Sequence, residues 1–485
     1  MSLRDTRQSA ALIVISLLAI LWVAIIAQYV PARYSYDWDS SQLGRGVAEY
    51  SIQKHQPHPP GYPLWVAAAR IAAKLAPSIP GALSVLALLF SVGGLIFFWL
   101  TARELLAGGD PVWLAALLAF APPVLFYSAA QSSYSSDFFA ACAAGYFAVK
   151  IWKGAPRHFL YFCLFMALAM GLRQSGAVFL VPLLALSGFT AWRRSKSEFG
   201  LGLAMGAAGF AAWFVPFVRL AGGWAKYGEM TSGQFSATVS RTSILFGAPA
   251  ADHLAMLVDL AAWSTTALAG LAFAGAMPRA IAGESEAGNV LAPPRLLVFL
   301  WAAPNLLFGA LFHFPKPGYL MLSLPALFLG IGLAARIHGR SWKTRAAAIM
   351  GIAISLAVSY FPYQEWGPVR YAGLCFQVAR YMPPALSRID ADNRLLANAF
   401  AQAGPRTPVI CVHWSGESPN CRSAPWDFAG GRWVDRRSYA DSLSAGSEVL
   451  FLCGRSGPPA VWRAKMREWT QLAEGWQISV WRARK

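Results

Sequence analysis

Residues 10–30 read AALIVISLLAILWVAIIAQYV and contain no charged side chain. About 20 apolar residues are enough for a helix to cross the hydrocarbon core of a bilayer. Arg4 and Arg7 precede the run, as basic residues precede the apolar part of a signal peptide, but the run is long and no small-residue cleavage site stands out. We therefore interpret it as a retained signal-anchor helix.

The composition of the whole chain agrees with a membrane protein. Of its 485 residues, 56% are hydrophobic and only 13% are charged, whereas soluble domains carry about 25% charged residues. The net charge of +18 is explained by basic residues in cytoplasmic loops and near anionic headgroups, so we expect no nucleic-acid partner. The six cysteines include no CxxC pair, and we expect no metal site built on cysteine.

Apolar runs recur along the chain and predict a polytopic α-helical membrane domain over residues 1–362. Gly171-Leu172-Arg173-Gln174 separates two short runs, for which one broken helix or a re-entrant pair are both open. We expect about eleven transmembrane helices, near residues 10–30, 81–102, 112–128, 137–152, 158–171, 175–191, 199–221, 253–277, 296–313, 319–335 and 346–362.

Clusters of Lys and Arg decide the predicted orientation, because basic residues are enriched in cytoplasmic loops. A cytoplasmic N-terminus places the main clusters inside, namely Lys150/Lys153/Arg157, Arg193/Arg194/Lys196 and Arg336/Arg340/Lys343/Arg345. The external face then holds a long first loop over residues 31–80 and all residues after the last span. Residues 62–75 of this loop have a pattern suited to a helix lying in the membrane interface, or to a surface helix of a soluble loop.

Residues 363–485 differ in character, with polar side chains and charges of both signs. We expect a small soluble α/β lobe outside the membrane. Its candidate strands are short apolar or alternating stretches between turn residues, at 407–414, 448–453 and 476–481. Cys411 has Cys421 or Cys453 as a candidate disulfide partner in an oxidising compartment.

Two carboxylates, Asp37 and Asp39, follow the first span directly at the water boundary. These two carboxylates are interpreted either as solvated loop charges or as part of a functional site. The stretch from Gln56 to Pro63, QPHPPGYP, is rich in proline, which stiffens a chain and restricts the residue before it. A loop stiffened in this way is able to hold a site, and a carboxylate there can accept a proton from a hydroxyl group.

Other ionisable groups fall on the same predicted face. Asp137 begins the fourth span, Arg173 interrupts an apolar hairpin, and Lys316 lies in a proline-rich turn. Each has a structural reading, as a helix N-terminal carboxylate, a headgroup contact or a turn charge. Ionisable groups at membrane depth are costly, however, and indicate function. Together they suit a substrate that is half lipid and half polar, with a phosphate that Arg and Lys can neutralise.

The chain resembles the GT-C superfamily of polyprenyl-phosphate-sugar-dependent glycosyltransferases, in particular family 39, which includes protein O-mannosyltransferases and lipid A aminoarabinose transferases. The resemblance covers residues 10–362. It lies in segments around the acids and cations just described, namely Asp39-Ser40, His58-Pro59-Pro60-Gly61-Tyr62, Gly171-Leu172-Arg173-Gln174-Ser175, and Lys316-Pro317-Gly318-Tyr319 followed by Leu324-Pro325.

The resemblance implies a GT-C fold and a role for each matching residue. Asp39 matches the catalytic aspartate of the first loop and Asp137 the second-loop acid, so the resemblance implies a catalytic role for both, while His58 and Arg173 match contacts to the carrier phosphate. Lys316 and Tyr319 match a basic-Tyr motif near the last spans, and we expect them to bind the donor phosphate. Two positions depart from the pattern. Ser40 replaces a second acid, which makes Asp37 a substitute, and His58 replaces a lysine, which makes phosphate binding sensitive to pH.

The implied reaction is transfer of a hexosyl or pentosyl group from a polyprenyl-phosphate sugar to a hydroxyl of a lipid, glycan or protein acceptor. It would take place on the periplasmic face of a bacterial inner membrane, by inverting displacement, with no cofactor beyond the lipid-linked donor and no metal. A transporter or flippase for an anionic lipid-linked glycan is the alternative, although the chain has no internal repeat and its charges lie at one boundary. An assembly protein with an external binding lobe is a third possibility.

Overall fold

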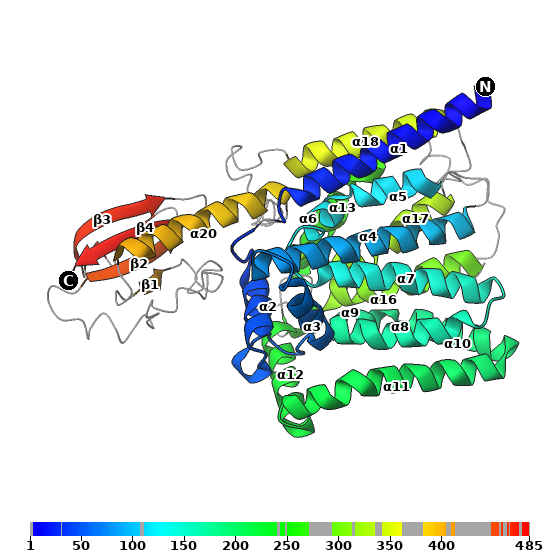
Figure 1. Cartoon of the computed structure of the whole chain (residues 1–485), viewed down its shortest axis with the longest axis horizontal. Coiled ribbons are helices and arrows are strands. Elements are labelled where there is room, and N and C mark those ends of the chain that lie inside the picture. The colour runs from blue at the N-terminus through cyan, green and yellow to red at the C-terminus, as the bar shows by residue number, and fades with distance from the viewer. Residues whose placement is uncertain are drawn as a thin grey trace.

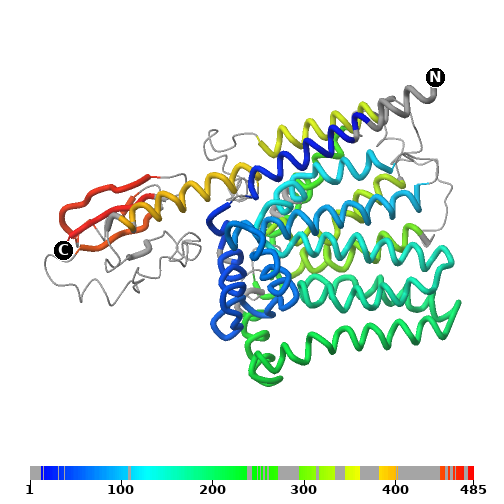
Figure 2. Tube along the Cα trace, in the orientation of Figure 1, coloured from blue at the N-terminus to red at the C-terminus, as the bar shows by residue number. Residues whose placement is uncertain are grey.

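The structure is a computed structural model that describes residues 3–30, 32–106, 111–239, 243–247, 250–270, 293–312, 316–334, 342–360, 382–403, 409–412, 448–454, 457–458, 463–464, 466–474 and 478–484. Long helices lie side by side in one bundle, with shorter helices across one end and a small sheet beyond that end (Figure 1). The N-terminus lies at the opposite end of the bundle from the sheet (Figure 2).

The bundle helices follow the apolar runs closely, because those runs have no other way to bury their backbone polar groups in a membrane. α7 packs between α4 and α8, and α11 packs along α8. The helices of the bundle are α1 Leu3–Ala27, α4 Ile79–Leu105, α5 Pro111–Ala119, α6 Pro122–Tyr127, α7 Tyr134–Trp152, α8 His158–Leu172, α9 Gln174–Ala177, α10 Val181–Arg194, α11 Lys196–Leu220, α13 Ala250–Ser264, α16 Pro293–Leu311, α17 Leu324–Ala334 and α18 Trp342–Tyr360.

Local sequence explains where several of these helices begin or break. Ser78 caps α4 by accepting a hydrogen bond from the Gly81 N–H at 3.0 Å. The run expected as one span over 112–128 is instead two helices, α5 and α6, because Pro122 and Pro123 lack the N–H that would continue α5. Short 3₁₀ segments join other helices, namely η2 Val178–Leu180, η4 Thr266–Leu268 and η5 Pro317–Leu322.

The two short runs around Arg173 are α8 and the continuous series α9–η2–α10. Arg173 lies between them with extended dihedrals, φ −154° and ψ 97°, which end α8. The chain turns back there, so that α8 and α10 are neighbours in the bundle. Four helices among the described residues are long and apolar enough to cross a membrane, namely Ile79–Leu105, Gln174–Arg194, Lys196–Leu220 and Pro294–Leu311. The expected number of spans stays a prediction, and part of the eighth, residues 271–277, lies outside the described ranges.

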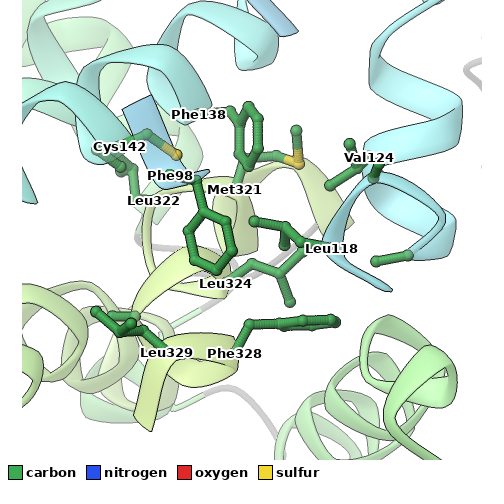
Figure 3. Close-up of a cluster of buried hydrophobic side chains, with 14 of the residues drawn as sticks. Phe98, Leu118, Val124, Phe138, Cys142, Met321, Leu322, Leu324, Phe328 and Leu329 are labelled. Carbon is green, nitrogen blue, oxygen red and sulfur yellow. The ribbon is translucent and has the colours of Figure 1, made fainter. Parts of the chain in front are cut away.

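The main hydrophobic core anchors the segment that carries Lys316. Met321 and Leu322 of η5 are fully buried against Phe138 of α7 and Phe98 of α4, and Phe328 of α17 closes the cluster (Figure 3). Between membrane helices such contacts stabilise by van der Waals packing. Well-packed side chains therefore hold η5 in place, and with it Lys316 at its start.

The first loop folds onto the end of the bundle. It contains α2 Trp38–Ala48, η1 Ile52–Lys54 and α3 Pro63–Ala72, and α12 Trp224–Val239 and η3 Ile244–Phe246 also lie outside the long helices. Trp65 and Val66 of α3 are buried, whereas Ile71 is 66% exposed. Gly61, at φ +111°, passes close to α11, where a Cβ would lie 2.8 Å from the Phe217 ring. Only glycine fits this close approach.

The C-terminal residues form a four-stranded sheet of order β1-β2-β4-β3, with β1 parallel to β2 and the other pairs antiparallel. Its elements are α20 Pro383–Ala403, β1 Val409–Val412, β2 Glu448–Gly454, β3 Arg467–Glu474 and β4 Ile478–Arg484. The three expected strands are present, but β3 was missed because this edge strand is polar and mostly exposed. Cys453 is a free, buried thiol, whereas Cys421 and the domain boundary near residue 362 lie outside the described residues.

Candidate active site

Two first-loop acids share one lysine. Lys316 Nζ lies 2.6 Å from Asp39 Oδ2 and 2.9 Å from Asp37 Oδ2. The other oxygen of Asp37 caps α2 by accepting bonds from the Ser40 N–H at 2.8 Å and the Ser40 hydroxyl at 2.7 Å. Asp37 is therefore held by two interactions, the cap of α2 and the ion pair with Lys316. Among the described contacts, Asp39 is held by Lys316 alone. The Asp39 side chain is 27% exposed, so a substrate can reach it.

Opposing effects act on the Asp39 carboxyl. Burial acts to raise its pKa, but the positive charge of Lys316, together with the smaller effects of His58, the hydrogen bond from Lys316 and Arg173, outweighs burial and holds the pKa well below its usual range. Asp39 is ionised at neutral pH, as a proton acceptor must be. While Lys316 stays bound, however, the carboxylate is a weak base.

Arg173 and Asp137 form a buried ion pair. Arg173 Nε lies 2.8 Å from Asp137 Oδ2 at an angle that is not that of a hydrogen bond, and the two side chains are 7% and 3% exposed. A second nitrogen of the guanidinium donates to the Ser133 hydroxyl at 2.8 Å. Behind Asp137 there is no space, since a Cβ at Gly176 would lie 2.0 Å from Asp137 Oδ1.

Three tyrosines surround the Arg173 guanidinium. Its carbon lies 4.1 Å from the centre of the Tyr134 ring and 5.7 Å from each of the Tyr62 and Tyr319 rings. Aromatic faces attract a cation. The arrangement holds a planar, permanently charged group whose donors match the geometry of a phosphate.

His58 is bonded at both ring nitrogens. Nδ1 lies 2.6 Å from Gln42 Oε1, and Nε2 lies 3.0 Å from the Tyr62 hydroxyl. The Gln42 oxygen assigns the proton to Nδ1, so that Nε2 accepts from Tyr62. Burial lowers the pKa of His58, and the nearby charge of Asp39 opposes this effect only in part. His58 is thus a neutral imidazole at neutral pH.

The η5 turn ties the two ion-pair groups together. Tyr319 follows Lys316 by three residues and places its ring edge against Tyr134, with 5.5 Å between ring centres. Gly318 lies against the Tyr134 ring, where a Cβ would be 2.4 Å from Cγ, and its N–H donates to the Tyr127 hydroxyl at 2.9 Å. Within the described ranges, no three His, Cys, Asp or Glu side chains gather as metal ligands would.

Comparison with known proteins gives one kind of match. No family model matches the sequence, and no curated relative does. Two crystal structures of ArnT from Cupriavidus metallidurans match the structure over 98% of both chains, one bound to undecaprenyl phosphate, with a TM-score of 0.61 and 12% identity, and one in the apo state, with a TM-score of 0.60 and 14% identity. The chain has the ArnT fold. ArnT is a GT-C membrane protein, so the GT-C fold expected from the sequence is confirmed.

All seven residues singled out in the sequence lie in this one region of the ArnT fold: Asp37, Asp39, His58, Asp137, Arg173, Lys316 and Tyr319. Sequence reasoning missed the residues that hold them, which are Gln42, Ser133, Tyr134 and the ring of Tyr62. A usable signal was present for two of these, because the polar run 131–136 directly precedes Asp137. Gln42 lies within a helix and has no such signal.

Proposed function

We propose that this chain is a glycosyltransferase that moves a sugar from a polyprenyl-phosphate donor to an acceptor hydroxyl at the external face of a bacterial inner membrane. The observation that carries the proposal is the meeting of Asp37 and Asp39 with Lys316, beside a caged Arg173, in a membrane fold shared with a protein crystallised with undecaprenyl phosphate. The acceptor, whether lipid, glycan or protein, has to reach Asp39.

In this mechanism the cations take the phosphate and an acid takes the proton. Arg173 and Lys316 would neutralise the charge that develops on the departing phosphate, with His58 and Tyr319 beside them. Asp39 would accept the proton of the acceptor hydroxyl as its oxygen attacks the anomeric carbon, and the bond to the phosphate breaks in the same step with inversion. Positioning and electrostatics supply the rate, and no enzyme-bound sugar is required.

The charges of the free site suggest how donor binding prepares the base. Three carboxylates, Asp37, Asp39 and Asp137, face two cations, Lys316 and Arg173. A donor phosphate adds another negative charge and competes with Asp39 for Lys316. As Lys316 turns to the phosphate, the pKa of Asp39 rises and the carboxylate becomes a better base at the moment when the leaving group is in place.

Asp137 has a different place in this mechanism. Its side chain is 3% exposed, one of its oxygens is paired with Arg173, and the other lies against Gly176. We assign it the role of counter-ion that holds Arg173, in place of the catalytic role that the resemblance implies. Removing one partner of a buried pair costs roughly 3–5 kcal/mol, so its loss would disturb the phosphate site.

The test begins with the purified full-length protein in gentle detergent. Mass spectrometry should find a polyprenyl-phosphate sugar bound, and the same lipid should support transfer to a hydroxyl acceptor. Arg173→Ala should weaken undecaprenyl phosphate binding strongly, with Arg173→Lys intermediate because an ammonium lacks the planar fork of donors. Movement of an intact lipid-linked glycan across vesicles without transfer would favour the transporter alternative. Equal binding by all three proteins would reduce Arg173 to a headgroup contact.

A further inference from the structure

α20 belongs to two hydrophobic cores at once. Near its start, Leu386 and Ile389 pack against the core of the membrane bundle. Farther along, Leu396 and Ala399 pack against the apolar side of the C-terminal sheet. Figure 1 shows α20 as a continuous helix between the bundle and the sheet. α20 therefore links the core of the bundle to the core of the sheet.

Side chains in the middle of α20 form hydrogen bonds to the backbone just before the first-loop acids. Asp390 Oδ1 accepts bonds from the backbone N–H groups of Arg33 and Tyr34, both at 3.1 Å. Asn393 donates from its side-chain amide to the Ser35 carbonyl at 3.3 Å. Asn393 is 4% exposed and the Asp390 side chain 13%, and the other Asp390 oxygen is paired within the helix with Arg394 at 2.9 Å.

The segment held by these hydrogen bonds, residues 33–35, leads directly into the site. On its other side, the Tyr36 N–H donates to Gln131 Oε1 at 2.8 Å, so side chains from distant elements hold the backbone of residues 33–36. Asp37 is the next residue, and its two oxygens cap α2 and meet Lys316. A shift of this segment would move the start of α2, and with it Asp39 in the first helical turn.

We propose that α20 positions the first-loop acids, with Asp390 and Asn393 as positioning residues, so that the C-terminal lobe is part of the catalytic geometry. The inference rests on the proposed function, since it gives the acids a reaction to serve. Exposed backbone groups of a loop are usually satisfied by water. Here a nearly buried carboxylate and amide form these hydrogen bonds instead, which restricts where the loop can lie.

The kinetic test compares matched substitutions on one helix. Asn393→Ala and Asp390→Ala should lower kcat roughly 10- to 100-fold, as expected for small misplacements of a reacting group, and leave undecaprenyl phosphate affinity unchanged. Asn398→Ala, the same change at an exposed position of α20, should behave as wild type. Asp390→Asn keeps an oxygen acceptor and should recover part of kcat. A purely structural role would instead lower the folded fraction and leave kcat per donor-binding molecule intact.

Hydrogen exchange gives a second arm that needs no turnover. Peptides covering residues 32–48 should exchange faster in Asp390→Ala and Asn393→Ala than in wild type or Asn398→Ala. Unchanged exchange in both variants would overturn the proposal, and so would faster exchange with a wild-type kcat. If the wild-type protein transfers no sugar from any polyprenyl-phosphate donor, the proposed function fails, while the exchange result still decides whether α20 holds the acids.

Discussion

At the scale of single residues, the proposed chemistry depends on which of two neighbouring acids is the base. Asp37 uses one oxygen to cap α2 and the other to bind Lys316, whereas the described contacts of Asp39 leave one of its oxygens for an acceptor hydroxyl; the two side chains are 23% and 27% exposed. We assign proton transfer to Asp39 and orientation of α2 and Lys316 to Asp37.

Asp39→Asn should therefore lower turnover roughly 10²- to 10⁴-fold, because an amide keeps the shape but cannot accept the proton. Asp37→Asn should cost less, since asparagine also caps helices well. A turnover assay and an undecaprenyl phosphate binding measurement on both variants separate chemistry from recognition. A larger loss in Asp37→Asn would exchange the two roles, and near wild-type turnover in both would remove these acids from catalysis.

His58 should make donor binding dependent on pH. Burial holds its pKa below the ordinary value, so the free enzyme carries a neutral ring at pH 7. A phosphate placed beside the ring would raise that pKa, and binding would then take up a proton. Donor affinity should increase a few-fold between pH 8 and pH 6, a range in which a phosphodiester donor does not itself titrate. His58→Gln should bind with a flat pH profile, and an unchanged slope in this variant would exclude His58.

At the scale of elements, α9 packs closely against the Arg173–Asp137 pair. Gly176→Ala would put a Cβ 2.0 Å from Asp137 Oδ1 and should destabilise the protein by about 1–3 kcal/mol, with a roughly tenfold loss of undecaprenyl phosphate affinity as Arg173 shifts. Gly200→Ala in α11 is the matched control, because nothing lies within 4 Å of its added Cβ. Thermal unfolding and binding measured on both proteins should differ clearly; equal behaviour would mean that Asp137 has room to move.

At the scale of the whole molecule, the site and the C-terminal sheet lie at one end of the bundle, and the N-terminus lies at the other (Figure 1, Figure 2). Two of the basic clusters lie at the end away from the site, where Glu104 pairs with Lys150 at 3.1 Å and Lys153 at 2.9 Å, and Arg194 donates to the Trp152 carbonyl at 2.9 Å. This separation favours a cytoplasmic N-terminus, as basic residues are retained inside.

The topology is directly testable with reporter fusions. A reporter that is active only in the periplasm should be active when fused after residue 485 and inactive when fused after Lys153. A reporter active only in the cytoplasm should give the reverse pattern. A cytoplasmic signal from the C-terminal fusion would place the site on the inner face and contradict the proposed use of a periplasmic donor and acceptor.

Much of the architecture follows from local sequence. Hydropathy located most of the helices to within a few residues, because a membrane leaves an apolar run almost no choice but a helix, although α1 begins at Leu3 and α13 ends at Ser264, well away from the expected bounds. The errors arose where a single short feature overrides the run, as at Pro122 and Pro123, or where an edge strand carries no apolar pattern, as at β3. The first-loop acids and Arg173 were visible as charges in places where simple connections do not need them.

Only the tertiary structure decided which charge meets which. Asp39 and Lys316 are 277 residues apart in the chain, and hydropathy says nothing about partners at that distance. Their pairing depends on how η5 packs into the core and how α2 lies on the end of the bundle. The tyrosine cage of Arg173 and the grip of α20 on residues 33–36 were invisible for the same reason. Such contacts come from the packing of whole helices, whereas composition and spacing report only on each segment by itself.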